Sequence, residues 1–283
     1  MKILVTGAGG QLGYDVCREL ATRGITHTGV ERQDFDITNS TDVDSYIKVY
    51  RPNGVIHCAA YTKVDQAERE PEKCWGINAD GVKNIAAACR KNGAKLIYLS
   101  TDYVFDGKGI DFQETGATPS PLNIYGKSKL AGEQIVQQEL KHFFIVRTSW
   151  MFGIHGQNFV KSILKKAKTQ DKLCVVDDQF GSPTYTKDLA RLLCDMIATD
   201  KYGIYHAVNE GVCSWAEFAK EILLYTGIQT RVVEISATEY PSLAKRPSNS
   251  RMSTESLTKG GFAKLPSWKD ALKRYLREEG AGK

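Results

Sequence analysis

Short apolar runs alternate with amphipathic stretches along the first half of the chain. The runs at 2–6, 26–30, 54–59, 95–100 and 143–148 predict strands. The stretches at about 11–23, 40–50, 64–92 and 121–140 predict helices. Because strands that alternate with helices form βαβ crossovers, this order predicts a parallel sheet covered on both faces. The run at 54–59 lacks polar alternation, as expected for a strand buried on two sides.

The pattern loosens after residue 150. Helices are expected at about 157–170, 184–198, 214–226 and 267–278, and short strands near 173–176, 204–208 and 231–235. The prediction is an α/β fold of the doubly wound Rossmann type with a smaller C-terminal substrate-binding α/β lobe. Residues 1–153, together with parts of 176–208, are expected to form the dinucleotide-binding domain. Residues 154–283 form mainly the lobe, interleaved with it.

Composition narrows the class of protein. The chain has 283 residues, of which 42% are hydrophobic and 25% charged, which is ordinary for a globular protein with a real core. No apolar run approaches the roughly 18–20 residues that span a bilayer. A strand-like run follows Met1 directly, so no signal peptide is expected, and the predicted location is cytoplasmic, without a membrane partner.

Charge and cysteine usage exclude other classes. The net charge of +5 comes from dispersed side chains, which suits a small anionic substrate and shows no nucleic-acid footprint. The seven cysteines form no CxxC pair. They are therefore interpreted as reduced thiols, not as disulfides or zinc ligands.

A glycine-rich segment joins the first predicted strand to the first helix. Gly7, Gly10 and Gly13 are spaced by three, and Gln11 and Leu12 lie between the last two. Glycines at these points allow a tight turn, close approach of the backbone to a pyrophosphate, and close helix–strand packing. The helix N-terminus would then face the phosphates. The alternative is an ordinary flexible turn, but the strand-to-helix context favours dinucleotide binding by these five residues.

The second predicted strand ends in Glu31-Arg32. An acidic group there bonds the adenosine ribose hydroxyls of NAD, whereas an arginine accepts the 2′-phosphate of NADP. The chain offers both side by side. The cofactor is therefore predicted to be NADPH or NADH, with use of both left open, and a solvated charge pair remains the alternative reading.

Two further segments complete the predicted cofactor site. Asp36-Ile37 offers a polar group for the adenine amine and an apolar one for its ring. Ala59-Ala60-Tyr61 follows the third strand, where small side chains let a cofactor lie against the sheet. Both segments are expected at the carboxyl edge of the sheet, where ligands of such folds bind. Simple close packing explains the alanines equally well.

Tyr125 and Lys129 are candidate catalytic residues. With Pro121 in the first turn and Ser120 as cap, both are expected inside one helix, where a spacing of four places them on one face. Chance alone supplies such a Tyr–Lys pair in a chain of this composition, so the evidence is its position after the fourth strand.

The chemistry needs both residues of this pair. A free phenol has a pKa near 10 and is a reluctant acid at neutral pH. A neighbouring ammonium would stabilise the phenolate, and a pKa three units lower requires roughly 4 kcal/mol. Tyr125 is therefore expected to act as a general acid and Lys129 to activate it and to bond the nicotinamide ribose.

The segment Ser100-Thr101-Asp102-Tyr103 closes the fourth strand. Thr101, chosen over Ser100, can bond a ketone oxygen as negative charge develops there. Asp102 could hold a substrate hydroxyl. A simple strand-end turn is the alternative. Asn78 could supply either a structural or a proton-relay hydrogen bond.

Together these residues resemble the extended short-chain dehydrogenase/reductase family. The shared marks are Thr6-Gly7-x-x-Gly10-x-x-Gly13, Asn78-x-x-Gly81, Ser100-Thr101 and Tyr125-x-x-x-Lys129. More narrowly, the chain resembles the dTDP-4-dehydrorhamnose reductase family. The segments that carry this are Ala59-Ala60-Tyr61-Thr62-x-Val64-Asp65, Ser100 to Gly107, Pro121 to Lys129, Arg147-Thr148-Ser149-Trp150-x-Phe152-Gly153, Gln179-x-Gly181-x-Pro183-Thr184 and Arg246-Pro247-x-Asn249-Ser250.

The resemblance implies a reaction and its partners. A dTDP-linked 4-keto-6-deoxyhexose, dTDP-4-dehydro-β-L-rhamnose, would be reduced at C4 to dTDP-L-rhamnose. Tyr125 would give the proton and Lys129 would bind ribose. Substrate contacts would come from Thr101, Asp102, Tyr103 and Trp150.

The resemblance also suggests two further features, a bound divalent metal ion and a dimer. Some relatives hold a divalent ion, such as Mg²⁺, at a carboxylate-lined dimer contact, and Asp15 and Asp188 are the counterparts by type. Lys187 adjoins the second, so no metal ligands are assigned, and both Mg²⁺ and a homodimer are left open. The competing functions are a non-catalytic NADP-binding regulatory subunit and an NAD-retaining nucleotide-sugar epimerase or dehydratase. The complete set of Thr101, Tyr125 and Lys129 favours the reductase.

Overall fold

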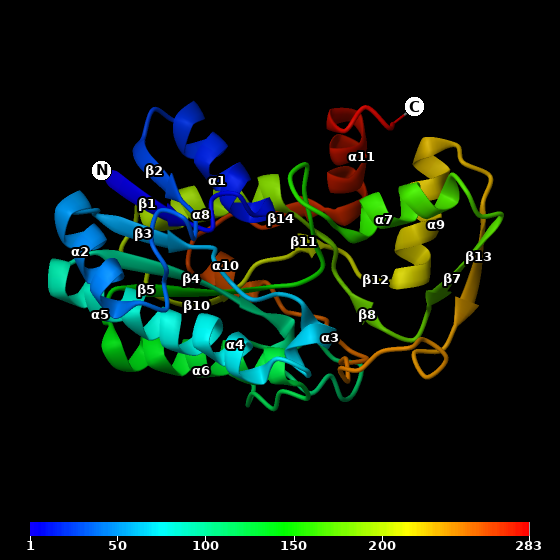
Figure 1. The fold of residues 1–283 in the computed structure, drawn as a ribbon. Coiled ribbons are helices and arrows are strands. Elements are labelled where there is room, and N and C mark those ends of the chain that lie inside the picture. The colour runs from blue at the N-terminus through cyan, green and yellow to red at the C-terminus, as the bar shows by residue number, and fades with distance from the viewer. Residues whose placement is uncertain (283) are drawn as a thin grey trace.

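The computed structural model describes residues 1–282, which form a six-stranded parallel sheet and a smaller lobe beside it (Figure 1). The sheet order is β10-β5-β4-β3-β1-β2, and every neighbouring pair is parallel. The strands are β1 (Lys2–Thr6), β2 (Thr26–Val30), β3 (Gly54–His57), β4 (Lys95–Thr101), β5 (Phe143–Thr148) and β10 (Gly203–His206). The predicted doubly wound α/β fold is confirmed.

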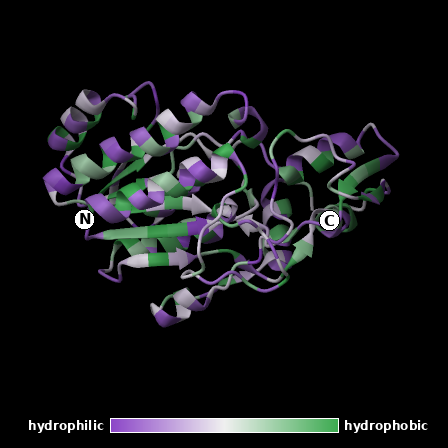
Figure 2. Cartoon of the chain, turned by 90° about the horizontal axis from the view of Figure 1, so that it is seen from below, coloured by the Kyte–Doolittle hydropathy of each residue, from purple (hydrophilic) through white to green (hydrophobic). Residues whose placement is uncertain are grey.

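Helices cover both faces of this sheet because successive side chains of a strand point to opposite sides. Ile3 and Val5 of β1 pack in the core under α1 (Gln11–Thr22) and α8 (Thr186–Ile197). Leu4, between them, packs under α2 (Ser40–Tyr50), α5 (Gly81–Asn92) and α6 (Ile124–Glu139). The central sheet strands are largely coloured as hydrophobic, and the helices alternate between the two colours (Figure 2).

The lobe has its own aromatic-rich core, in which Phe152, Phe218 and Tyr275 meet. Its helices are α7 (Phe159–Ala167), α9 (Trp215–Thr226) and α11 (Trp268–Glu278). Short strands pair as β7 (Lys172–Val176) with β13 (Arg231–Ile235), β6 (Met151–Phe152) with β9 (Thr184–Tyr185), and β8 (Phe180–Gly181) with β12 (Cys213–Ser214). The strands β11 (Asn209–Glu210) and β14 (Leu265–Ser267) also pair, and α10 (Glu255–Lys259) packs beside β10.

The continuous helix predicted at 64–92 is wrong. The segment breaks into α3 (Val64–Ala67), α4 (Pro71–Trp75), a π-helical turn η1 (Gly76–Asp80) and α5. Pro71 causes the first break, because a proline disfavours helical backbone in the residue before it, and Glu70 adopts φ −124° and ψ 55°. A short 3₁₀ turn, η2 (Asp102–Val104), follows β4.

The predicted start of the catalytic helix is also wrong. Helix α6 begins at Ile124, after both Ser120 and Pro121. Asn123 is the cap, and its side chain accepts a hydrogen bond from the Gly126 N–H at 2.8 Å. Asparagine is among the strongest N-cap residues, and because the Asn123 backbone is extended, the helix cannot begin before this residue. Tyr125 therefore lies in the first turn.

Among residues 1–282, no helix combines the length and the apolar character needed to cross a membrane.

Candidate functional site

The glycine loop lies where the carboxyl ends of β1 and β3 meet. Gly7 has φ +66°, and a Cβ there would fall 2.7 Å from the Ala59 backbone nitrogen. A Cβ on Gly13 would fall 2.2 Å from the Gly7 carbonyl oxygen. Larger residues are excluded at both positions, and the backbone stays close to the sheet edge. Helix α1 begins directly after Gly10 without a side-chain cap, which leaves its N–H groups for an anion.

A cleft of about 540 Å³ opens beside this loop. Its walls include eight of the residues predicted to bind a cofactor, namely Gly7, Gly10, Glu31, Arg32, Asp36, Ile37, Ala59 and Ala60. Sequence reasoning missed Phe35 and Lys73, which also line it. Phe35 lies between the predicted contacts Arg32 and Asp36, so its position in the cleft could have been predicted. Nothing in the sequence around Lys73 indicated that it lines the cleft.

The other predicted cofactor residues do not line this cleft. Leu12 is buried in the core and Gly13 supports the loop from behind. Gln11 turns toward the lobe, where its side-chain oxygen accepts a hydrogen bond from Asn158 at 3.1 Å. The Tyr61 phenol donates to Glu70 at 2.9 Å.

Opposite charges sit side by side in the cleft. The Arg32 side chain is 79% exposed and its guanidinium lies 3.2 Å from an Asp36 carboxylate oxygen. The pKa of Asp36 is lowered, chiefly by the hydrogen bond from the Thr38 N–H. The Glu31 carboxylate lies against Gly9, where a Cβ would be 2.3 Å from it. Carboxylate acceptors and an exposed guanidinium are therefore both present at the cleft.

The predicted reacting groups meet at the carboxyl end of β4. Thr101 is the last residue of that strand, and its hydroxyl donates to Asp102 at 3.0 Å and accepts from the Tyr103 N–H at 3.2 Å. Burial raises the pKa of Tyr125, and a hydrogen bond between Thr101 and Tyr125 partly opposes that rise. The Tyr103 ring meets the Tyr125 ring edge-on, with centroids 5.8 Å apart.

Lys129 lies one turn after Tyr125 on α6 and is only 3% exposed. Its ammonium lies 4.2 Å from the centre of the Tyr98 ring. Burial lowers the pKa of Lys129 to about 7, against the opposing charge of Glu133. In this structure burial is the largest influence on the pKa of Tyr125 and raises it. Activation of Tyr125 by Lys129 stays a prediction.

Asp102 combines burial with an open hydrogen-bonding position. Burial raises its pKa to about 6, and the neighbouring Ser250 side chain partly opposes that rise. In the described part of the chain its Oδ2 has no hydrogen-bond partner. A buried acceptor of this kind fits a hydroxyl donor, since an unpaired buried polar atom costs free energy.

Asn78 lies in the π-helical turn and braces the site. Its side-chain oxygen accepts from the Tyr61 N–H at 2.8 Å, and its side-chain nitrogen donates to the Tyr61 carbonyl at 3.0 Å. The same nitrogen donates to the Ser128 hydroxyl at 3.0 Å, next to Lys129. Of the two roles considered for Asn78, this geometry matches the structural one.

A second cavity of about 790 Å³ lies in the lobe. Trp215 and Phe159 line it, as do Lys245 and Arg246, so it has both aromatic and cationic walls. Trp150 stacks on the far face of Trp215 and does not line the cavity itself. Trp215 was missed from the sequence, because it reads as an ordinary first residue of a helix.

The two carboxylates considered for a divalent ion are already engaged. Asp188 accepts hydrogen bonds from Arg274 at 2.8 and 2.7 Å and from Asn209 at 2.9 Å. Asp15 accepts one from Thr186 at 2.5 Å. Among residues 1–282, no three His, Cys, Asp or Glu side chains converge as metal ligands would. Within the described part of this chain, both carboxylates are therefore already paired.

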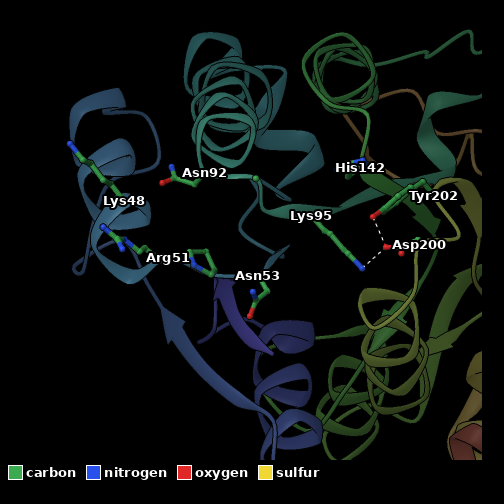
Figure 3. A pocket seen from close by; sticks show the side chains of 10 residues that line it. Lys48, Arg51, Asn53, Asn92, Lys95, His142, Asp200 and Tyr202 are labelled. Atoms are coloured by element: carbon green, nitrogen blue, oxygen red, sulfur yellow. Dashed lines mark hydrogen bonds and ion pairs between the residues drawn. The ribbon is translucent and has the colours of Figure 1, made fainter.

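Another cavity, of about 1050 Å³, is at the opposite edge of the sheet (Figure 3). Lys95, at the start of β4, pairs with Asp200 at 2.7 Å, and the Tyr202 hydroxyl donates to the same carboxylate. None of the predicted site residues lines it. Ligands of open α/β sheets bind at the carboxyl ends of the strands, so the smaller cleft and the lobe cavity are the candidate site.

Comparisons with known proteins show the family of the chain. The family model described as RmlD substrate binding domain matches residues 1–280. A spore coat polysaccharide biosynthesis protein of Bacillus subtilis is 40% identical over 98% of this chain and 97% of its own. A dTDP-4-dehydrorhamnose reductase of Sinorhizobium fredii is also 40% identical, with the same two shares. The crystal structure of a dTDP-4-dehydrorhamnose reductase from Bacillus anthracis, in complex with NADP, has a TM-score of 0.96 and 43% identity, covering 98% of this chain and 99% of that one.

Proposed function

The chain belongs to the dTDP-4-dehydrorhamnose reductase family of NADPH-dependent oxidoreductases, and from this membership we propose that it reduces the C4 ketone of dTDP-4-dehydro-β-L-rhamnose to dTDP-L-rhamnose. The substrate class follows from the names of the relatives. The assignment of roles to residues rests on the geometry around Thr101 and Tyr125.

We propose that the cleft beside the glycine loop holds the dinucleotide. The N–H groups that begin α1 would bond the pyrophosphate. Arg32 would donate hydrogen bonds to the 2′-phosphate of NADPH. If NADH is used instead, Glu31 would accept hydrogen bonds from the ribose hydroxyls. A reduced nicotinamide supplies a hydride to the substrate carbon. Because NADP is bound in the Bacillus anthracis structure, we expect NADPH to be the better cofactor.

Tyr125 would give the proton to the C4 oxygen. The Thr101 hydroxyl, next to Tyr125, would donate a hydrogen bond to the C4 oxygen as negative charge develops on that oxygen. Lys129 would bind the nicotinamide ribose and, when charged, favour the phenolate after transfer. The open Oδ2 of Asp102 would accept a sugar hydroxyl.

The observation that carries the proposal is the grouping of Thr101 and Tyr125 around Tyr103 at the end of β4: the Tyr103 N–H donates to Thr101 at 3.2 Å, and the Tyr103 ring meets the Tyr125 ring edge-on. Ala59 and Ala60 line the cofactor cleft. Arg246, whose positive charge acts to lower the pKa of Tyr103, lines the lobe cavity. A ketone bound there would meet a dinucleotide on one side and have room for a nucleotide on the other.

The test follows NADPH absorbance with the dTDP-4-keto-6-deoxy sugar supplied through the preceding epimerase. We expect substrate-dependent oxidation, with dTDP-L-rhamnose as the product. No oxidation of NADPH or NADH by a folded protein that binds both would refute the proposal. Tightly held NAD in the purified protein, with no net oxidation, would favour the epimerase.

A further inference from the structure

One wall of the lobe cavity is a single irregular segment, residues 236–246, here called the strap. It supplies Tyr240, Leu243, Lys245 and Arg246 to the cavity. The strap follows β13 and forms no regular helix or strand of its own. Its position therefore depends on the side chains that hold it.

The strap is held at its end by Asp65, which belongs to the other part of the molecule. Asp65 lies on α3, shortly after the alanines of the cofactor cleft. Its Oδ1 accepts from the backbone N–H groups of Leu243 and Ala244, both at 3.1 Å. Its Oδ2 accepts from the Arg246 guanidinium at 2.6 Å. A carboxylate that accepts several N–H donors forms strong, charge-assisted bonds.

The same region also holds the catalytic helix. The Glu68 carboxylate, just after α3, accepts from the Ile124 N–H at 2.8 Å. The Asn123 side chain, which caps α6, donates to the Lys245 carbonyl at 2.8 Å. Hydrogen bonds therefore join three segments pairwise: the region after β3, the strap and the first turn of α6. This set of contacts is called the triangle, and Tyr125 lies in the first turn of α6.

Arg246 connects the triangle to the reacting groups. It lies beside the Tyr103 phenol, and Tyr103 packs edge-on against Tyr125. Ser242 also donates to Asp65 at 3.0 Å. The Asp65 carboxylate thus bonds four residues of the strap, Ser242, Leu243, Ala244 and Arg246, and fixes the Arg246 guanidinium.

We propose that Asp65 is a positioning residue for the sugar nucleotide: it fixes the strap against the cofactor-binding half, so that the substrate in the lobe cavity is held with its ketone at Tyr125. This rests on the proposed function for the identity of the ligand. The coupling itself, one carboxylate joining the two halves across the cavity wall, stands on the contacts above. Asp65 touches no reacting atom.

The test uses Asp65→Asn in the full chain. The amide keeps the shape but loses the charge, and its nitrogen cannot accept hydrogen bonds. We expect the KM for the sugar nucleotide to rise about tenfold with kcat changed less than about twofold, because a looser wall weakens binding more than the chemical step. The dissociation constant of NADPH, measured by its fluorescence, should not change. Asp44→Asn, which breaks the exposed Lys91 pair on α2, is the matched control and should leave all values unchanged.

Amide hydrogen exchange gives a second readout that needs no activity. In Asp65→Asn the strap amides, including those of Leu243 and Ala244, should exchange at least about tenfold faster than in the parent chain. Arg246→Gln removes the same ion pair from the other side and should reproduce the effect if Asp65→Asn does not fold. Unchanged exchange and unchanged KM in a folded variant would overturn the proposal. If the parent chain reduces no sugar nucleotide while Asp65→Asn still speeds exchange in the strap, the proposed function fails, but the role of Asp65 in fixing the strap stands.

Discussion

Trp150 and Trp215 stack face to face, with ring centroids 3.6 Å apart and ring planes 11° from parallel. Trp150 has φ +48°, a left-handed conformation that costs about 1–3 kcal/mol for a bulky residue. Its ring lies between Trp215 and Gly181, where a Cβ would fall 2.8 Å from the indole. The stack therefore holds a strained residue in place at the entrance to the lobe core.

Trp215→Ala should lower both stability and substrate affinity. Loss of the ring removes the support of Trp150 and part of the cavity wall, so we expect the free energy of unfolding to fall by about 3 kcal/mol. The KM for the sugar nucleotide should rise at least about tenfold, since stacking on an aromatic face is worth about 1–3 kcal/mol per base. Denaturant melts and steady-state kinetics measure the two effects. Leu224→Ala, on an exposed position of the same helix, is the control.

Tyr125→Phe should separate proton transfer from binding. The substitution removes the phenol hydroxyl but keeps the ring that packs on Tyr103. We expect kcat to fall by about 10²–10⁴, the usual contribution of a general acid. NADPH affinity should stay the same. Turnover equal to that of the parent chain would show that another group gives the proton.

Arg32→Ala should change cofactor preference. Arg32 is highly exposed, and its one ion pair is with Asp36, so little stability depends on it. We expect the KM for NADPH to rise about tenfold, because a charge-assisted bond to the 2′-phosphate is lost. The KM for NADH should change little. Equal losses with both cofactors would place Arg32 outside the 2′-phosphate site.

Lys129→Met should change how stability depends on pH. The pKa of Lys129 is about 7 in the folded chain and 10.5 ordinarily. Between these values the unfolded chain binds a proton that the folded chain does not, so stability rises with pH in this window. Below pH 7 the full cost of burying the charge applies, on the order of 4 kcal/mol. The variant should therefore melt above the parent at pH 6, and the gap should shrink by pH 9.5. A constant gap would contradict the shift.

Treatment with EDTA should not change activity. Asp188 is already paired with Arg274 and hydrogen-bonded to Asn209, and Asp15 accepts from Thr186. A divalent ion would have to displace a buried ion pair, whose separation costs about 3–5 kcal/mol. The measurement is the initial rate before and after chelation and after addition of Mg²⁺. A loss that Mg²⁺ restores would show an ion site elsewhere.

The strands were predicted well from the sequence because burial on both faces leaves long apolar runs. The predictions at 2–6 and 143–148 coincide with β1 and β5. The long helix at 64–92 failed because its amphipathic pattern continues across Pro71, and hydrophobic periodicity does not register a proline break.

The cofactor cleft was largely predictable, since its residues follow strand ends in one βαβ unit. The substrate side was not. Asp65 and Arg246 are 181 positions apart, and only the folded chain brings their charges together. Trp215 gained its place by stacking on Trp150 across the lobe. Such pairings depend on tertiary packing, which no local pattern encodes.

The strand β10 completes the sheet beside β5 only after the chain has already built part of the lobe. One cut in the chain therefore cannot separate the two halves. A fragment that stopped before β10 would leave β5 as a bare sheet edge, which is a template for aggregation. Grafting the lobe of a relative to exchange sugar preference, with α8 and β10 retained from the parent, requires three junctions: two around the segment between β5 and α8, and one after β10. In evolution the same arrangement favours change of the lobe by substitution in place over exchange as a unit.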